Sequence, residues 1–130
     1  MANPSNAPLL GYPTDIANKH FSIFDHTGPK SYANIGTSSG AGDVINASDI
    51  GWGGFDKLVT TGGGYTFSGT YFIKVFTGHT TTTPTNTQSI QNVRTLQWFT
   101  TSAAFGALST EVTNATDLSA EVVRLEAIGV

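Results

Sequence analysis

Short segments in which apolar and polar residues alternate dominate this sequence, and turns rich in glycine, asparagine or aspartate separate them. In the longest segment, residues 65–77, every odd position from 65 to 75 is aromatic or aliphatic except Gly69. A period of two is typical of a β-strand with one buried face, because successive side chains point to opposite sides. Gly69 predicts a bulge or bend in this strand. Phe72 and Phe76, on the second face, predict that the far half of the strand is covered on both sides.

The same criteria predict eight short strands, with turn signals about every eight to fifteen residues and no sustained helical period. The expected fold class is therefore all-β, an antiparallel β-sandwich or jelly-roll-like single domain. The predicted strands cover residues 20–24, 31–35, 43–45, 55–61, 65–77, 93–101, 108–113 and 121–130.

The residue types of two segments are also compatible with a helical conformation. Residues 119–127 contain good helix formers, but the β-branched pair Val122–Val123 favours a strand there. The sequence Ala47–Ile50 predicts a single helical turn, capped by Ser48 or Asp49 and stopped by the glycines that follow it.

One domain accounts for the 130 residues, because a folded chain of this size buries enough surface for one core. We expect residues 1–15 to form an extended N-terminal arm and residues 16–130 to form a single β-sandwich domain. The arm contains three of the five prolines, which exclude a helix there. Its apolar side chains need cover, on this subunit's own core or on a neighbouring subunit; they are Leu9, Leu10 and Tyr12.

Only 12% of the residues are charged, about half the ~25% of an average soluble domain. The net charge of −3 and the scatter of the six basic residues exclude a nucleic-acid-binding surface. No apolar run is long enough to cross a membrane, and the N-terminus lacks the pattern of a secretory signal. The absence of cysteine excludes disulfides, thiolate metal sites and cysteine nucleophiles. A surface so poor in charge must be covered by hydroxyl and amide groups or by a partner.

Residues 36–40 match G-x-S-x-G, the motif around the nucleophile of α/β-hydrolases. That motif needs a helix after the serine, and the sequence that follows here favours none, so we attribute the match to chance. A metal or acid–base site would draw on His20, Asp25, His26 and His79. Their spacing across a strand and a turn favours structural roles instead. We therefore expect no catalytic residue, no metal site, no cofactor and no enzymatic activity.

Trp52 stands in the sequence Gly51–Gly54, where its neighbours have no side chains to cover it. An indole flanked by glycines is either a plug inserted into its own core or an exposed anchor for a protein partner. With Tyr65 and Tyr71 it is also a candidate platform on which a sugar stacks. The sequence leaves these three interpretations open.

Three stretches carry a resemblance to a known family: residues 25–32 (DHTGPKSY), 47–56 (ASDIGWGGFD) and 114–129 (NATDLSAEVVRLEAIG). Together they resemble small structural proteins of tailed bacteriophages, the capsid decoration or cement proteins. The resemblance implies a non-enzymatic β protein that binds the outer surface of a phage capsid, as a homotrimer, and stabilises the expanded shell. The implied partners are the major capsid protein and further copies of the chain. The implied location is the virion surface, reached from the host cytoplasm during assembly.

The family supplies no residue roles for this chain, so the interface is predicted from physical arguments. Contacts of a cement protein should bury apolar or neutral groups, and weak contacts repeated around a shell give high avidity. The prolines make the arm partly rigid, which lowers the entropic cost of ordering it against a partner. The predicted interface residues are Pro8, Leu9, Leu10, Tyr12, Pro13 and Trp52.

The main alternative is a carbohydrate-binding or receptor-binding β module of a phage tail or fibre. In that case Trp52 and Tyr71 would form the aromatic platform. Glycan binding that is lost in Trp52→Ala would distinguish it from a capsid-binding protein.

Overall fold

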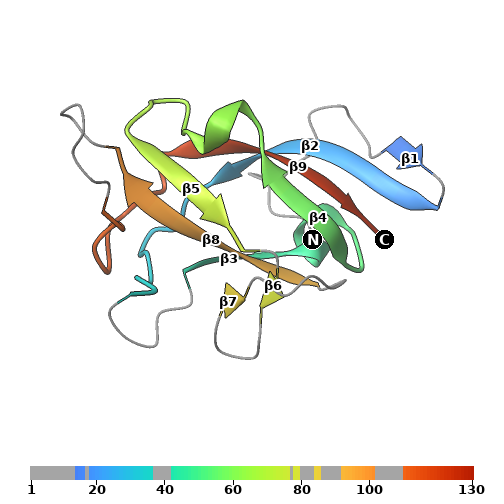
Figure 1. The fold of residues 1–130 in the computed structure, drawn as a ribbon, viewed down its shortest axis with the longest axis horizontal. Helices are drawn as coiled ribbons and strands as arrows, with labels where there is room; N and C mark the ends of the chain where they lie inside the picture. The colour runs from blue at the N-terminus through green and yellow to red at the C-terminus, as the bar shows by residue number, and fades with distance from the viewer. Residues whose placement is uncertain are drawn as a thin grey trace.

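A computed structural model describes residues 14–16, 18–36, 42–76, 78–79, 84–85, 92–101 and 110–130 (Figure 1). These residues form short strands and two 3-10 turns, η2 (Ala47–Ile50) and η3 (Gly62–Gly64). The strands are β1 (Thr14–Ile16), β2 (Lys19–Thr27), β3 (Asp43–Asn46), β4 (Phe55–Thr60), β5 (Tyr71–Val75), β6 (Gly78–His79), β7 (Pro84–Thr85), β8 (Val93–Thr100) and β9 (Val122–Gly129). None of the described helices is long and apolar enough to cross a membrane.

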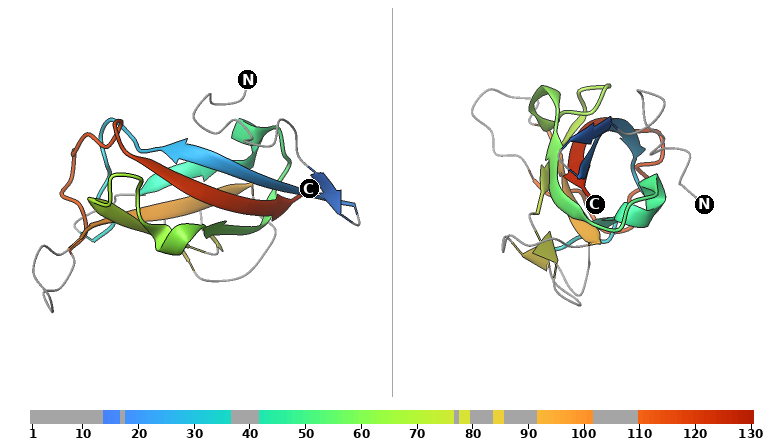
Figure 2. Two further views of the ribbon diagram at one scale, coloured as in Figure 1. Left: turned by 90° about the horizontal axis from the view of Figure 1, so that it is seen from above. Right: turned by 90° about the vertical axis from the view of Figure 1, so that its right-hand side faces the viewer.

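Every strand pair is antiparallel, which confirms the predicted all-β class. One sheet has the order β1-β2-β9-β4, a second has the order β3-β8-β5, and β6 and β7 form a small hairpin. Seen end on, the strands of the two larger sheets surround a common core (Figure 2). The two sheets approach each other where β4 leads into β5: Phe67, in the segment just before β5, donates its N–H to the Val122 carbonyl of β9 at 3.0 Å.

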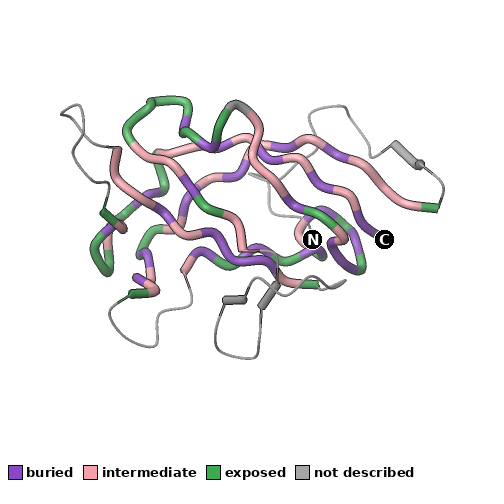
Figure 3. Tube along the Cα trace, in the orientation of Figure 1, coloured by how far each residue is buried: buried purple, intermediate pink, exposed green. Residues whose placement is uncertain are grey.

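The core is filled from alternate positions of the long strands. Along β9 the buried residues include Val123, Leu125 and Ala127, the face predicted from the sequence, while the residues between them are half-buried (Figure 3). Strand, not helix, is therefore correct for this segment. Phe24 of β2 and Trp98 of β8 are fully buried in the same core.

The segment 65–77 is not the single long strand predicted above. Only β5 is regular strand, and Tyr65 pairs with Phe72 in an antiparallel bridge, so that the chain reverses between them. Gly69 takes a φ of 75°, and its N–H donates to the Thr66 carbonyl at 2.9 Å, which closes a tight turn. The expectation that the odd-numbered apolar positions share one buried face is wrong for the first arm: Tyr65 and Phe67 are exposed and Thr66 between them is buried, whereas in β5 Ile73 is buried.

The predicted strand 31–35 is also wrong as regular strand, although the segment is partly buried. Tyr32 N–H donates to Thr116 at 2.9 Å and its carbonyl accepts from Ala115 at 2.7 Å, outside any ladder. Of the predicted strand 108–113, residues 110–113 are described, and Glu111 forms one isolated bridge to Phe99.

The predicted helical turn is present as η2, but its cap is not Ser48 or Asp49 and lies two residues before Ser48. Asn46 occupies the N-cap position, and its backbone N–H donates to Asp49 Oδ2 at 3.3 Å. Gly51 closes the turn with a φ of 79°, in the left-handed conformation that favours glycine.

Candidate functional site

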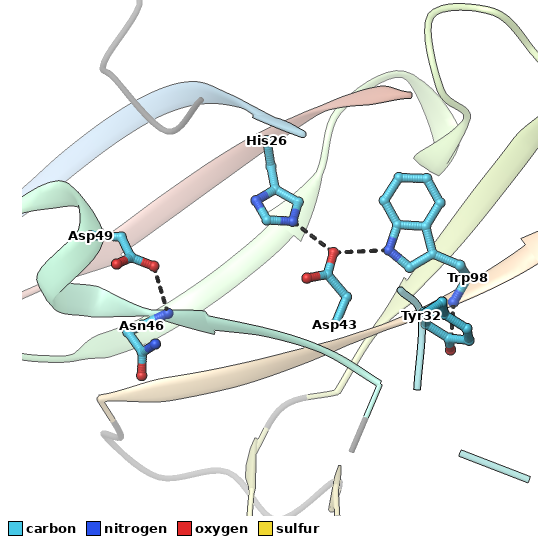
Figure 4. Close-up of polar contacts among 6 residues, drawn as sticks. All are labelled: His26, Tyr32, Asp43, Asn46, Asp49 and Trp98. Atoms are coloured by element: carbon cyan, nitrogen blue, oxygen red, sulfur yellow. Dashed lines mark hydrogen bonds and ion pairs between the residues drawn. The ribbon is translucent and has the colours of Figure 1, made fainter. Parts of the chain in front are cut away.

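A buried polar network joins the two larger sheets at one end of the core (Figure 4). His26 of β2 and Asp43 of β3 are both buried, and His26 Nε2 lies 2.7 Å from Asp43 Oδ2. The same carboxylate oxygen accepts the indole Nε1–H of Trp98 at 2.9 Å. A carboxylate that is taken out of water needs such partners, because an unpaired buried charge is costly.

Trp98 connects this carboxylate to a second one through Tyr32. The Trp98 backbone N–H donates to Tyr32 Oη at 3.1 Å, and the Tyr32 hydroxyl donates to Glu111 Oε2 at 2.8 Å. Glu111 also accepts the backbone N–H of Ile35 at 2.6 Å. Burial raises the pKa of Tyr32 above its ordinary value, and the neighbouring Glu111 carboxylate adds to the increase while the Trp98 N–H opposes it.

This network holds parts of the chain together that lie far apart in the sequence. His26 and Asp43 connect β2 to β3 across a boundary without ladder hydrogen bonds, and Trp98 and Glu111 tie β8 to the segment that follows β2. His26, Asp43 and Trp98 are all buried, so we assign them a structural role and call these three residues the buried clasp.

The raised pKa of Tyr32 predicts a loss of stability at high pH. The native state keeps the Tyr32 proton while the unfolded chain releases it above pH about 10, so the free energy of unfolding should fall as the pH rises. The fall is about 1.4 kcal/mol per pH unit from this group. Urea titrations from pH 8 to about 11 should show a shallower fall in Tyr32→Phe. Tyr65→Phe, at an exposed tyrosine, serves as the control and should follow the wild type; an unchanged slope in Tyr32→Phe contradicts the assignment.

The other candidate acid–base residues are held in separate contacts. Asp25 pairs with Arg124 on the outer face, with Arg124 Nε donating to Asp25 Oδ1 at 2.8 Å. The His20 ring lies 5.5 Å from the ring of Trp52. Within the described part of the chain, no three histidines, aspartates or glutamates are grouped to hold a metal ion. The side chain of His79 and residues 37–40 of the serine motif lie outside the part that the structure describes.

Trp52 is the one predicted interface residue that the structure describes, and it lies in the core. It is 6% exposed, and its ring packs against Phe55 with the centroids 6.3 Å apart. Tyr71 is half-buried and meets Trp98 edge-on at 6.3 Å, so Trp52 and Tyr71 do not form an exposed platform. The remaining predicted interface residues, Pro8, Leu9, Leu10, Tyr12 and Pro13, lie outside the described residues.

A partly exposed aromatic cluster lies on β5, β8 and the segment that precedes β5. We define it as Tyr65, Phe67, Phe72 and Phe99. Tyr65 is 55% exposed and Phe67 is 62% exposed, values that are high for such large apolar side chains. Phe72 and Phe99 are cross-strand partners whose rings stack with centroids 5.1 Å apart, and Tyr65 lies 5.9 Å from Phe72.

Two cations flank the aromatic cluster. Arg124 Cζ lies 5.2 Å from the centre of the Phe67 ring, and Lys74 Nζ lies 4.8 Å from the centre of the Phe76 ring. Lys74 follows Phe72 by two positions in β5, so the two side chains share a face of the strand. Both contacts are in the range of a cation–π attraction, which holds each long side chain over a ring.

Sequence reasoning did not identify this cluster as a site. The alternation predicts that Phe72 and Phe76 are covered by the protein, whereas both are half-buried. The hairpin at Gly69 is what places Tyr65 beside Phe72, and the β5–β8 register is what adds Phe99. Comparison with protein-family models, with curated protein sequences and with solved structures finds no match to this chain.

Proposed function

We propose that this chain is a non-enzymatic virion structural protein that binds the outer surface of a phage capsid and stabilises it. The observation that carries the proposal is the aromatic cluster, in which the exposed rings of Tyr65 and Phe67 lie beside the half-buried, stacked rings of Phe72 and Phe99. The resemblance of three stretches to decoration proteins supplies the partner, the major capsid protein. The protein would act on the virion surface after assembly in the host cytoplasm.

A protein partner suits the cluster better than a sugar does. Phe72 and Phe99 are nearly parallel, at 12°, and their centroids are too close for the rings to lie side by side, so each covers one face of the other. A stacked sugar needs open ring faces. Arg124 lies over the Phe67 ring, on a face that a sugar would need, and arginine together with aromatic side chains is enriched in protein interfaces.

The test is binding to phage capsid shells assembled from purified major capsid protein. Phe67→Ser should weaken co-sedimentation with shells by about thirtyfold, because it removes a ring that a partner would bury. Val130→Ser is the matched control, since Val130 is another exposed apolar residue, beyond the opposite end of β9. It should bind like the wild type. Folded wild-type protein that leaves shells undecorated contradicts the proposal.

The proposal includes association of the chain in threes, as the resemblance implies. Light scattering on the eluted protein should give a mass about three times that of the 13.6 kDa chain. A monomer that still decorates shells would remove the trimer from the proposal and keep the capsid contact.

A further inference from the structure

Two buried polar side chains of the core have no hydrogen-bond partner. Within the described part of the chain, the buried side-chain atoms without a partner are Ser22 Oγ, Trp52 Nε1 and Asp56 Oδ1. The Asp56 carboxylate bonds Lys19 through its other oxygen at 2.7 Å. Ser22 and Trp52 have no second polar side-chain atom, and the two residues are 1% and 6% exposed. Buried polar atoms in native proteins are nearly always hydrogen-bonded, because an unpaired one costs free energy.

The Trp52 indole lies over the last core position of β9. A Cβ at Gly129 would be 2.9 Å from Cε3 of Trp52, so the indole occupies the space that a side chain at position 129 would fill. Gly129 pairs with His20 of β2, and the His20 ring is 5.5 Å from the ring of Trp52. The indole therefore covers the pair that His20 and Gly129 form between β2 and β9.

Ser22 is a neighbour of this pair on the same face of the sheet. It follows His20 by two positions in β2, so both side chains point to the core face. It pairs with Ala127, which precedes Gly129 by two positions in β9. Ser22 and Gly129 are therefore diagonal neighbours, at a separation of about 7–8 Å that large aromatic side chains bridge. The Trp52 ring over Gly129 thus lies beside Ser22.

Small residues surround the indole on this side. The Trp52 backbone N–H donates to the carbonyl of Ala47, a fully buried residue of η2, at 2.9 Å. The turn η2 lies toward the end of the core at which β9 ends (Figure 1, Figure 2). Ser22, Ala127 and Gly129 have small side chains or none, so they fill less of the region beside the ring than larger residues would.

The chemistry of the two unpartnered atoms defines what can join them. The Trp52 indole N–H can only donate, whereas the Ser22 hydroxyl can donate and accept, and the two atoms do not bond each other directly. A water molecule can accept from the indole and still donate to the hydroxyl oxygen. Buried waters in proteins typically bond polar groups that have no protein partner.

We infer that Ser22 Oγ and Trp52 Nε1 form a binding site for one internal water molecule, which bridges them. The bridge connects β2 to the segment after η2, so it holds the Trp52 side chain in the core by a polar contact as well as by packing. The site belongs to the isolated chain, and the inference does not depend on capsid binding.

Oxygen-17 relaxation dispersion of the full-length chain tests the water, because it detects water molecules that exchange slowly with solvent and does not report on the serine hydroxyl. We expect the wild type to hold about one more such molecule than Ser22→Ala, which removes one of the two bonding groups. Ser31→Ala is the matched control at an exposed serine and should hold as many as the wild type. Equal numbers in the wild type and Ser22→Ala would overturn the inference.

NMR of the indole protons assigns the position of the water. The Trp52 indole N–H should show a nuclear Overhauser effect to water in the wild type, and Ser22→Ala should reduce it at least about threefold. The Trp98 indole donates to Asp43 at 2.9 Å and should give the same signal in both proteins, which also shows that the variant is folded. A wild-type Trp52 indole without this effect would overturn the inference.

Discussion

Replacing Asp43 by alanine is expected to lower the free energy of unfolding by about 3 to 4 kcal/mol, a large part of the stability of a domain this size. The Asp43 carboxylate serves two buried groups through one oxygen, His26 Nε2 at 2.7 Å and Trp98 Nε1 at 2.9 Å. Alanine leaves the indole N–H of Trp98 in the core without its acceptor and removes the carboxylate from His26. A buried donor without an acceptor costs about 1 to 3 kcal/mol by itself.

Urea unfolding at neutral pH measures this loss, and two further variants separate its causes. Asp43→Asn keeps an oxygen for Trp98 but removes the charge, so its loss should be about half that of alanine. Asp49→Ala is the matched control, because Asp49 supports the η2 turn through one exposed bond to Asn46. It should cost about 1 kcal/mol or less. Equal losses at Asp43 and Asp49 would show that the buried clasp does not stabilise the fold.

Gly129→Ala is expected to cost about 3 kcal/mol, through overlap in a packed region. A Cβ at this position would overlap the Gly54 carbonyl oxygen and lie 2.9 Å from Cε3 of Trp52. The Gly54 carbonyl oxygen belongs to the backbone, so no side-chain rotamer change can relieve the overlap. The backbone is fixed there, since Gly53 N–H donates to the Val130 carbonyl at 2.6 Å and Val130 N–H donates back to Gly54 at 3.1 Å.

Gly53→Ala provides the control for this substitution. Its nearest neighbour to an added Cβ is the Val130 carbonyl oxygen at 3.5 Å, an ordinary contact, and the residue is exposed. Thermal unfolding should therefore leave Gly53→Ala close to the wild type and lower the midpoint of Gly129→Ala by roughly 10 °C or more. A similarly small change in the unfolding midpoint of both variants would mean that the end of β9 and residues 51–54 can move apart at little cost.

Local sequence pattern was sufficient for four of the eight predicted strands, while the predicted strand 20–24 is longer in the structure, as β2 (Lys19–Thr27). β9, β8, β4 and β3 lie within about one residue of their predicted bounds. In β9 and β3 every second residue is buried, and that alternation is visible in the sequence. The 3-10 turn at Ala47–Ile50 followed from the glycines after it.

Pattern failed where a turn or a cross-sheet contact decides the structure. The alternation of residues 65–77 is the same for one strand and for a hairpin, and only the positive φ of Gly69 separates the two. The sequence alone did not decide whether the Trp52 side chain lies in the core or on the surface. Its burial depends on Phe55 and Gly129, which the fold brings to it.

The sequence by itself therefore determined the class of the fold and the faces of its longest strands, because both depend on side chains within a few positions of each other. The tertiary structure alone decided what those strands bring together: the clasp of His26, Asp43 and Trp98, and the aromatic cluster around Phe72 and Phe99. The partners in the clasp are 17 and 55 residues apart. Such contacts depend on register and sheet order, and no local period in a single chain encodes either of them.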